Sequence, residues 1–383
     1  MAMMLTLVAC LAMDVEATDD AGLRRALAEA RPGTTIRVAS GDYAGGVFAR
    51  DLRGEPGRPI VIRAADPDRP PVFRGGNSAF HLSRVSHVEL RDLVAEGATA
   101  NGINIDDGGD LANPSHHVVL AGLTVRDVGP DGNRDGIKLS GLADFRVEGC
   151  AIERWGRGGS GIDMVGCRDG EIVDCTFRHG DEVGANGVQM KGGTRDVAVR
   201  RCRFEHAGGR AVNLGGSTGM AYFRPRPEGF EGKDLIVEDC TFLGSGAAVA
   251  FVGVDGATVR RNIIYRPRSW AFRILQETRD EGFVPSRGGR IERNLIVFRA
   301  DEWKGAVNVG SGTAPETFTF AGNAWHALDD PSRSNPTLPV AESGGVHGVE
   351  PHFIDAPSGD LRLDPRHPDP RTESGTIYSG RRP

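Results

Sequence analysis

The middle of the chain holds residues whose types and order would suit proton abstraction from a substrate with a carboxylate, namely Lys191, Arg210, Tyr222 and Arg273. An arginine beside such a carboxylate neutralises it, and the proton on the adjacent carbon becomes more acidic. A lysine removes that proton if burial or neighbouring cations lower its pKa, and a tyrosine hydroxyl can protonate the leaving oxygen. We therefore predict Lys191 as the base and Tyr222 as the proton donor. Arg210 or Arg273 would hold the carboxylate.

Lys138 is a second candidate for the base. It stands at the position in its sequence repeat that Asp163 occupies in the next repeat. A carboxylate beside a lysine raises the lysine pKa and makes it a poorer base. Two interpretations of Lys138 therefore stay open, a catalytic base and a surface ion pair with Asp163.

Two long polar segments, 215–234 and 276–290, interrupt the repeats near these residues. From Lys191 to Lys233 nine Lys or Arg residues stand against four Asp or Glu, although the whole chain has a net charge of −6. Loops on a rigid scaffold commonly carry binding residues, so we expect an anionic polymer as partner. The overall charge gives no reason to expect nucleic acid or an anionic membrane. The predicted substrate contacts in these segments are Arg224, Arg226 and Glu277.

The acidic residues give no clear pattern for a metal. A calcium site needs several oxygen ligands around one ion, and Asp106 with Asp107 is the nearest approach to such a cluster. Both are weak candidates, so no cofactor is predicted. The cysteines after Cys10 follow the repeat described next and lack the spacing of a zinc site.

The candidate residues fall in a repeat of apolar-polar-apolar phrases, such as Ile137-Lys138-Leu139 and Ile162-Asp163-Met164. Alternation at a period of two is typical of β-strands with one face inward. Stacked coils of such strands form a solenoid, because one coil alone cannot bury its apolar face. Their outward residues form a polar ladder on which a long sugar chain could lie. The predicted ladder is His81, Asn104, Lys138, Asp163, Gln189, Asn213, Ala250, Arg273 and Asn308, and its predicted substrate contacts are Asn104, Asp163, Gln189 and Asn213.

A second repeated phrase ends in Cys or Asn followed by an apolar residue. Its anchors Cys150, Cys175 and Cys202 are 25 and 27 residues apart, which gives the length of one coil. We predict a packed internal ladder of these small side chains rather than disulfides or metal ligands. Asn would be favoured at this turn because it tolerates left-handed backbone.

The fold class predicted from these repeats is all-β, a single-stranded right-handed parallel β-helix over residues 18–365. Leu23 and Leu27 have helical spacing within 20–30, so we expect a helix that caps the N-terminal end. The segment 353–363 would cap the far end, and 366–383 would form a tail. A solenoid with both ends capped needs no partner, so we predict a monomer.

Residues 1–17 form a predicted export signal or lipoprotein-type leader. The apolar run 1–13 is too short to span a bilayer, and the sequence up to Cys10 resembles a bacterial lipoprotein cleavage box. No Lys or Arg precedes this run, which departs from the usual export signal. We expect an extracytoplasmic protein, with a lipid anchor at Cys10 as an open alternative.

Two terminal segments and one internal segment resemble known β-helix proteins. The run PGTTIRVASGDYAGG with PGRPIVIRA looks like the opening of bacterial β-helix polysaccharide lyases, including the alginate lyase and chondroitinase B group. The tail VEPHFIDAPSGDLRLDPRHP is similar to their closing segment, and RDGIKLSG, which contains Lys138, is similar to the segment that carries the lysine base in a family of β-helix pectate lyases. The calcium-binding aspartates of that family have no clear equivalent here.

The resemblance and the basic segments together favour a lyase that cleaves a uronic-acid-containing polysaccharide by β-elimination. Two alternatives stay open. A glycoside hydrolase would need two carboxylates flanking the bond, and Asp106, Asp135 and Asp163 lie on neighbouring repeats. A glycan-binding solenoid or adhesin without catalysis would need no such pair.

Overall fold

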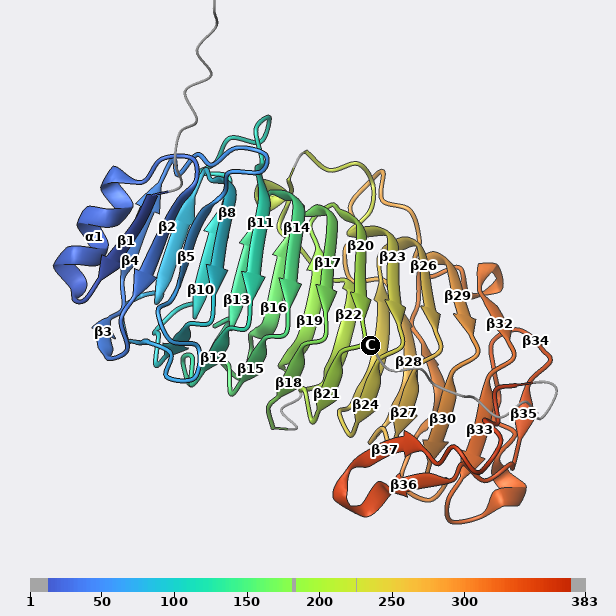
Figure 1. The fold of residues 1–383 in the computed structure, drawn as a ribbon. Helices are drawn as coiled ribbons and strands as arrows, with labels where there is room; N and C mark the ends of the chain where they lie inside the picture. The colour runs from blue at the N-terminus through green and yellow to red at the C-terminus, as the bar shows by residue number, and fades with distance from the viewer. Residues whose placement is uncertain (1–12, 181–183, 225, 373–383) are drawn as a thin grey trace, which may run out of the picture.

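The computed structural model describes residues 13–180, 184–224 and 226–372. The chain winds into a long solenoid, and three parallel sheets run along it (Figure 1). We name them sheet 1, sheet 2 and sheet 3, in the order in which each coil meets them. The predicted parallel β-helix is confirmed. Neighbouring strands within each of these sheets come from successive coils, as expected for stacked repeats.

Sheet 1 has 13 strands, with N-terminal coils at one end and C-terminal coils at the other. Its strands are β1 (Met13–Ala17), β2 (Thr34–Val38), β5 (Ile60–Ala64), β8 (Ser86–Arg91), β11 (Ser115–Ala121), β14 (Leu142–Glu148), β17 (Arg168–Val173), β20 (Thr194–Arg200), β23 (Gly232–Glu238), β26 (Val254–Arg260), β29 (Arg287–Glu292), β32 (Thr319–Ala321) and β34 (Glu342–Ser343).

Sheet 2 follows sheet 1 after a short turn and has 12 strands. They are β3 (Asp42–Ala44), β6 (Val72–Arg74), β9 (Val94–Glu96), β12 (Thr124–Arg126), β15 (Ala151–Glu153), β18 (Thr176–Arg178), β21 (Arg203–Glu205), β24 (Thr241–Leu243), β27 (Ile263–Tyr265), β30 (Leu295–Phe298), β33 (Ala324–Ala327) and β35 (Val346–His347).

Sheet 3 completes each coil and has 10 strands. They are β4 (Val47–Arg50), β7 (Phe80–Ser83), β10 (Ile103–Asp106), β13 (Ile137–Ser140), β16 (Ser160–Val165), β19 (Asn186–Lys191), β22 (Arg210–Gly215), β25 (Ala247–Val252), β28 (Trp270–Leu275) and β31 (Gly305–Val309).

The core is a column of like side chains stacked from coil to coil. Phe177, Phe204 and Phe242 occupy equivalent positions in sheet 2, and their rings stack at centroid distances of 4.7 and 4.9 Å. Such aromatic pairs add about 0.5–1.5 kcal/mol each beyond the area that they bury. The repeat therefore fixes the spacing of the coils from inside.

The Cys and Asn anchors form the predicted internal ladder at the turn between sheets 1 and 2. The backbone N–H of Cys150 donates to Cys175 Sγ at 3.4 Å, and the amide of Asn294 donates to Asn323 Oδ1 at 2.9 Å. All cysteines in the described ranges are free and buried, which confirms the prediction against disulfides. The prediction that Asn itself takes the left-handed backbone conformation is wrong. The residue before it does so, as in Arg293 with φ 52°. The Asn side chains instead bond buried backbone groups.

The predicted N-terminal helix is α1 (Asp20–Glu29). Asp19 caps it by accepting the Gly22 N–H at 2.6 Å, and Leu23 and Leu27 are buried against the first coil. Figure 1 shows α1 at the N-terminal end of the stack. The amphipathic helix therefore covers the open end of the apolar column, as expected.

Both predicted boundaries of the β-helix change in the structure. Residues 13–17, assigned to the leader, form β1 and pair in parallel with β2, so the solenoid begins earlier. Cys10 lies outside the described residues. The segment 353–363 forms the hairpin of β36 (Phe353–Asp355) and β37 (Asp360–Leu363), which lies along sheet 2 rather than over the far end (Figure 1). The outer face of sheet 2 is apolar around Leu295 and Val297, and Phe353 and Leu363 pack on it.

The predicted tail is also in contact with the solenoid, at Arg371. Arg371 donates to the Arg261 carbonyl at 3.2 Å and pairs with Asp369. Over the described parts of the chain, no helix has the length and apolar character needed to cross a bilayer.

Candidate functional site

The predicted polar ladder exists on sheet 3 with the predicted register. Lys138 of β13 pairs with Asp163 of β16, which pairs with Gln189 of β19, and Gln189 pairs with Asn213 of β22. The period-two pattern fixes this register, because a slip by one residue would turn apolar side chains outward. The candidate residues therefore lie on one face.

A groove of ≈ 890 Å³ lies over the C-terminal half of this ladder. Six predicted residues line it, which are Lys191, Arg210, Arg273, Gln189, Asn213 and Glu277. Arg268 and Lys304 add two further cations, and Glu277 is the one carboxylate among the described lining residues. Arg268 has a partner of its own, and the other four cations still outnumber the one described carboxylate, which makes this groove suited to a polyanion.

The two predicted arginines form the floor of the groove. Arg210 pairs with Glu277 at 2.6 Å and donates to Asn213 Oδ1 at 3.3 Å, while Arg273 donates to Asn308 Oδ1 at 3.1 Å. Burial and the neighbouring Arg210 cation lower the pKa of Arg273. Two like charges held together in a part-buried site favour an anion between them.

Lys191 stands at the end of β19, beside a bulge in the pairing with β22. Because of this bulge the residue packed against its side chain is Gly216. A Cβ on Gly216 would lie 3.2 Å from Lys191 Cβ and 2.4 Å from Gln189 Nε2, so a larger residue would displace these side chains. Lys191 Nζ also lies 3.5 Å from Asp163 Oδ1, a buried oxygen with no hydrogen-bond partner in the described part of the chain.

Lys138 lies in a buried ion-pair cluster and is not among the groove-lining residues. Its Nζ contacts Asp163 and lies 3.6 Å from Asp135, and both carboxylates are almost fully buried. Burial alone would lower the pKa of Lys138, but Asp163 and Asp135 outweigh it and raise the pKa. The geometry thus favours the ion-pair interpretation of Lys138. Asp163 positions two lysines and is itself closed to solvent.

This cluster makes stability depend on pH. Burial first, and then the Asp163 charge, raise the pKa of Asp135 from its usual 3.8 to about 6. Since the folded pKa exceeds the unfolded one, the contribution of Asp135 to stability is complete below the unfolded pKa and is lost as the pH rises through the folded pKa. Asp135→Asn, which keeps the oxygen that accepts the Ser160 N–H, removes this loss.

We expect the free energy of unfolding of Asp135→Asn, relative to wild type, to rise by about 1–2 kcal/mol between about pH 4.5 and about pH 7.5. Urea unfolding at the two pH values measures the difference. Asp131→Asn, at an exposed carboxylate, serves as the control with no such change. A difference that is the same at both pH values would contradict the role of Asp135.

Two loops form one wall at the turn from sheet 3 to sheet 1. Loop 1 (216–231) joins β22 to β23, and loop 2 (276–286) joins β28 to β29. Glu231 of loop 1, fully buried, accepts the Gly192 N–H at 2.8 Å, the Thr218 N–H at 2.7 Å and the hydroxyls of Thr218 and Thr278. The loops also meet through Phe223 and Phe283. Glu231 therefore joins both loops to the residue after Lys191.

The remaining predicted residues lie outside the groove lining. Arg224 folds back over earlier coils and binds both carboxylate oxygens of buried Asp107 at 2.6 Å. Each of these two residues is therefore the partner of the other. Tyr222 is 69% exposed on η1 (Met220–Tyr222), and Arg226 is exposed further along loop 1. Asn104 lies further along the ladder and donates to Asp106.

The weak metal candidates do not form a site together. Asp106 accepts hydrogen bonds from Ser83 at 2.7 Å, from Asn104 at 3.1 Å and from the Gly108 N–H at 2.8 Å, and its Oδ2 lies 2.7 Å from His81 Nε2. Asp107 is taken up by Arg224. The described residues near them provide no further carboxylates that converge with these two on one point.

Trp270 and Lys304 line the C-terminal end of the groove, and neither was predicted from the sequence. The Trp270 ring lies 4.7 Å from the Arg273 guanidinium carbon and 5.1 Å from Lys304 Nζ. Trp270 is on the same ladder as Ser160, Asn186 and Arg210, so extending that ladder by two coils would have found it. Lys304 stands in a turn before β31, where no repeat marks it.

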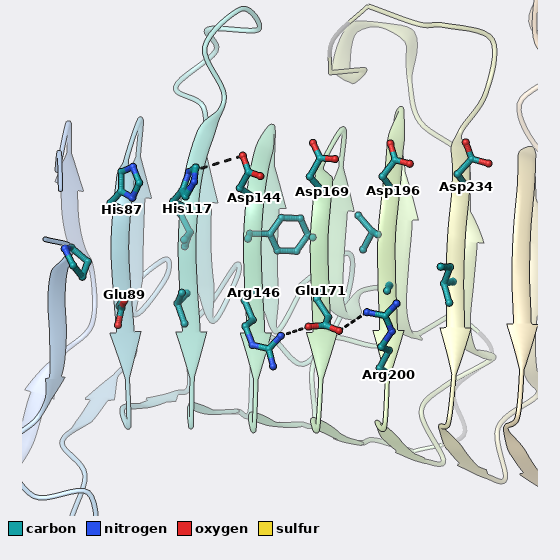
Figure 2. A pocket seen from close by; sticks show the side chains of 18 of the residues that line it. His87, Glu89, His117, Asp144, Arg146, Asp169, Glu171, Asp196, Arg200 and Asp234 are labelled. Atoms are coloured by element: carbon teal, nitrogen blue, oxygen red, sulfur yellow. Dashed lines mark hydrogen bonds and ion pairs between the residues drawn. The ribbon is translucent and has the colours of Figure 1, made fainter. Parts of the chain in front are cut away.

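A second groove of ≈ 810 Å³ lies on sheet 1 (Figure 2). Its lower row of charges is paired internally, since Glu171 contacts Arg146 and lies 2.6 Å from Arg200. Among the described lining residues of this groove, seven carboxylates stand against two arginines, so its charge is unfavourable for a polyanion. The sheet 3 groove is therefore the better candidate for binding one.

The comparison with protein families identifies the class of this fold. The model of the right handed beta helix region matches residues 72–269, more than half of the chain, so this protein belongs to the right-handed β-helix family. The comparison with curated proteins gives no significant match.

Solved structures with the same fold include two lyases and a tailspike protein. An alginate lyase from Paenibacillus sp. str. FPU-7 has a TM-score of 0.58 and 18% identity over 80% of this chain and 99% of its own. Pectate lyase Pel9A has a TM-score of 0.55 and 13% identity over 92% and 82%. The Dettilon tailspike protein has a TM-score of 0.57 and 10% identity over 86% and 68%. At these identities the likeness shows the fold alone.

Proposed function

We propose that this protein acts on carbohydrate, as a lyase that cleaves a uronic-acid-containing polysaccharide by β-elimination in the sheet 3 groove. The observation that carries the proposal is the charge of the groove, where Lys191, Arg210, Arg273 and Lys304 stand against the single described lining carboxylate, Glu277. A neutral glycan would not require this excess. The fold is shared with an alginate lyase and a pectate lyase, so it is compatible with this reaction class.

The groove contains the groups for the first two requirements of the reaction, which are neutralisation of the substrate carboxylate and removal of the C5 proton. Arg210 and Arg273 neutralise the substrate carboxylate, which makes the C5 proton acidic. Lys191 removes this proton, the C–H electron pair forms the C4–C5 double bond, and the glycosidic oxygen leaves C4. Because Tyr222 is not among the lining residues, the leaving oxygen takes its proton from solvent in the open groove.

Hydrolysis is less well supported by the same geometry. It needs two carboxylates on either side of the glycosidic bond. Asp135 and Asp163 are 2% and 0% exposed and held by Lys138, and Asp106 is bonded to its neighbours. Within the described lining of the groove, Glu277 alone offers a carboxylate.

The proposal is tested by incubating the protein with alginate, pectate, glucuronan and glycosaminoglycans. Elimination gives an unsaturated product that absorbs in the ultraviolet, and we expect it with at least one polyanion. New reducing ends without that absorbance would indicate hydrolysis instead. Retained binding without any product, tested also with neutral glycans, would indicate a glycan-binding solenoid.

Acting on a polymer implies a location outside the cytoplasm, so the proposal includes export, as a monomer, with a lipid anchor at Cys10 as one form of attachment. The groove itself requires neither export nor a lipid anchor. Fractionation of the native host cell and labelling with a radioactive fatty acid would decide between a released and an anchored protein.

A further inference from the structure

Three histidines meet at the N-terminal end of the sheet 1 groove. His87, His116 and His117 each present a ring nitrogen within 4.8 Å of the other two. Over residues 13–180, 184–224 and 226–372, this is the one group of three or more metal-binding side chains so close together. None of the three belongs to the sheet 3 groove.

The backbone of sheet 1 explains how adjacent residues reach the same face. His87 and His117 have φ of 51° and 53°, and the residues on either side of each stay in the strand pairing of β8 and β11. This left-handed residue interrupts the alternation, so His116 and His117 turn the same way instead of to opposite faces. Their Nδ1 atoms are 2.9 Å apart.

The next left-handed positions along sheet 1 are aspartates, and a backbone preference explains them. They are not counted with the three histidines. Asp144, Asp169, Asp196 and Asp234 continue the left-handed positions on the next four strands, in one row with His117 (Figure 2). Asp and His both tolerate this conformation better than most residues. His116 is different, since it lies in the strand itself, and backbone preference does not account for its convergence with the other two rings.

We propose that His87, His116 and His117 bind a divalent first-row transition metal, with Cu²⁺ as the best fit. Imidazole nitrogens suit Cu²⁺, Ni²⁺ and Zn²⁺ rather than Ca²⁺ or Mg²⁺. Two nitrogens at about 2.0–2.1 Å from one ion are about 2.9 Å apart at a right angle and about 3.3 Å apart in a tetrahedron. The spacing of the two Nδ1 atoms matches the right angle, which Cu²⁺ adopts in tetragonal sites.

The surroundings of the three rings leave the site open to an ion from solvent. His117 is exposed, and His87 and His116 are half-buried. Asp144 Oδ2, 4.0 Å from His117 Nδ1, adds a carboxylate beside the site (Figure 2). Three protein ligands leave positions open for water or an anion.

The test is a titration of the whole protein with Cu²⁺, followed by calorimetry and electron paramagnetic resonance. We expect one equivalent of Cu²⁺ to bind tightly, with a resonance spectrum split by several nitrogen ligands. His87→Asn and His117→Asn keep a side chain that accepts left-handed backbone, and His116→Gln keeps a polar strand residue. Because loss of outer partners alone weakens metal sites about 10–100-fold, each loss of a ligand is expected to weaken this equivalent by at least about 100-fold.

The matched control is the variant His352→Gln/His367→Gln, which removes a stacked histidine pair elsewhere on the molecule. It should keep the tight equivalent. The three site variants should have the melting temperature of wild type without metal and lose the rise that added Cu²⁺ gives to wild type. An unchanged equivalent in these variants, or a spectrum without nitrogen splitting, would overturn the proposal. Neither result depends on lyase activity.

Discussion

Lys191→Met is expected to lower the rate of β-elimination by about 10²–10⁴-fold, the usual contribution of a positioned base. Methionine keeps the stem that packs on Gly216 and removes only the amine. Asp163 retains its contact with Lys138, so the buried carboxylate stays paired and the fold should persist. Initial rates on the polyanion that gives the unsaturated product, together with a melting curve, measure both effects.

Lys191→Arg separates proton abstraction from charge. Arginine keeps the cation but stays protonated at any accessible pH, so it cannot serve as the base. If Lys191 is the base, the Arg and Met variants are equally slow. A nearly active Arg variant would show that Lys191 acts only by its charge.

Lys138→Met is the contrasting substitution two coils away. It would leave Asp135 and Asp163 buried together without their shared cation, and breaking such a pair costs about 3–5 kcal/mol of stability. We expect a large drop in melting temperature in this variant and a small one in Lys191→Met. A stable but inactive Lys138 variant, with an active Lys191 variant, would move the base to Lys138.

Glu231→Ala is expected to destabilise the protein by about 3–5 kcal/mol, because it leaves several buried donors without an acceptor. The carboxylate accepts the N–H groups of Gly192 and Thr218 and the hydroxyls of Thr218 and Thr278. Each lost hydrogen bond to a charged group contributes about 1.5–3 kcal/mol, and relaxation of the loops returns part of the total.

Chemical unfolding and hydrogen exchange of both loops measure this effect. Glu228→Ala, in the same loop but exposed and paired with Arg195, is the control and should change stability by less than about 1 kcal/mol. Exchange should increase in loop 2 as well as loop 1, because Thr278 is held by the same carboxylate. Faster exchange in loop 1 alone would contradict the idea that Glu231 joins the two.

The sequence by itself determined the solenoid and the register of its ladders. Alternation of inward and outward residues has a period of two, so every coil with this phrase must align with the next. Lys138, Asp163 and Gln189 therefore fell on one ladder as predicted. The helix at 20–29 was also predictable, since its cap and apolar spacing are local.

Only the tertiary structure decided which of these residues face a groove. Arg224 reaches Asp107, 117 positions earlier in the chain, and no repeat encodes such a contact. Glu231 joins segments 39 and 47 residues away from it, at Gly192 and Thr278. Loop residues are outside the strand pairing that sets the register, so their partners depend on how the loops fold over neighbouring coils.

The same reason separates Lys138 from Lys191, the two residues that the sequence offers as the base. Both occupy outward positions of sheet 3, and the pattern treats them alike. Burial and charge distinguish them. Lys138 is enclosed between Asp135 and Asp163, while Lys191 has only Asp163 near it, at 3.5 Å, and also lines the groove beside Arg210. These are properties of the packed coils and loops together. The sequence determined which residues lie on the ladder, and the three-dimensional packing decided which of them are open to a substrate.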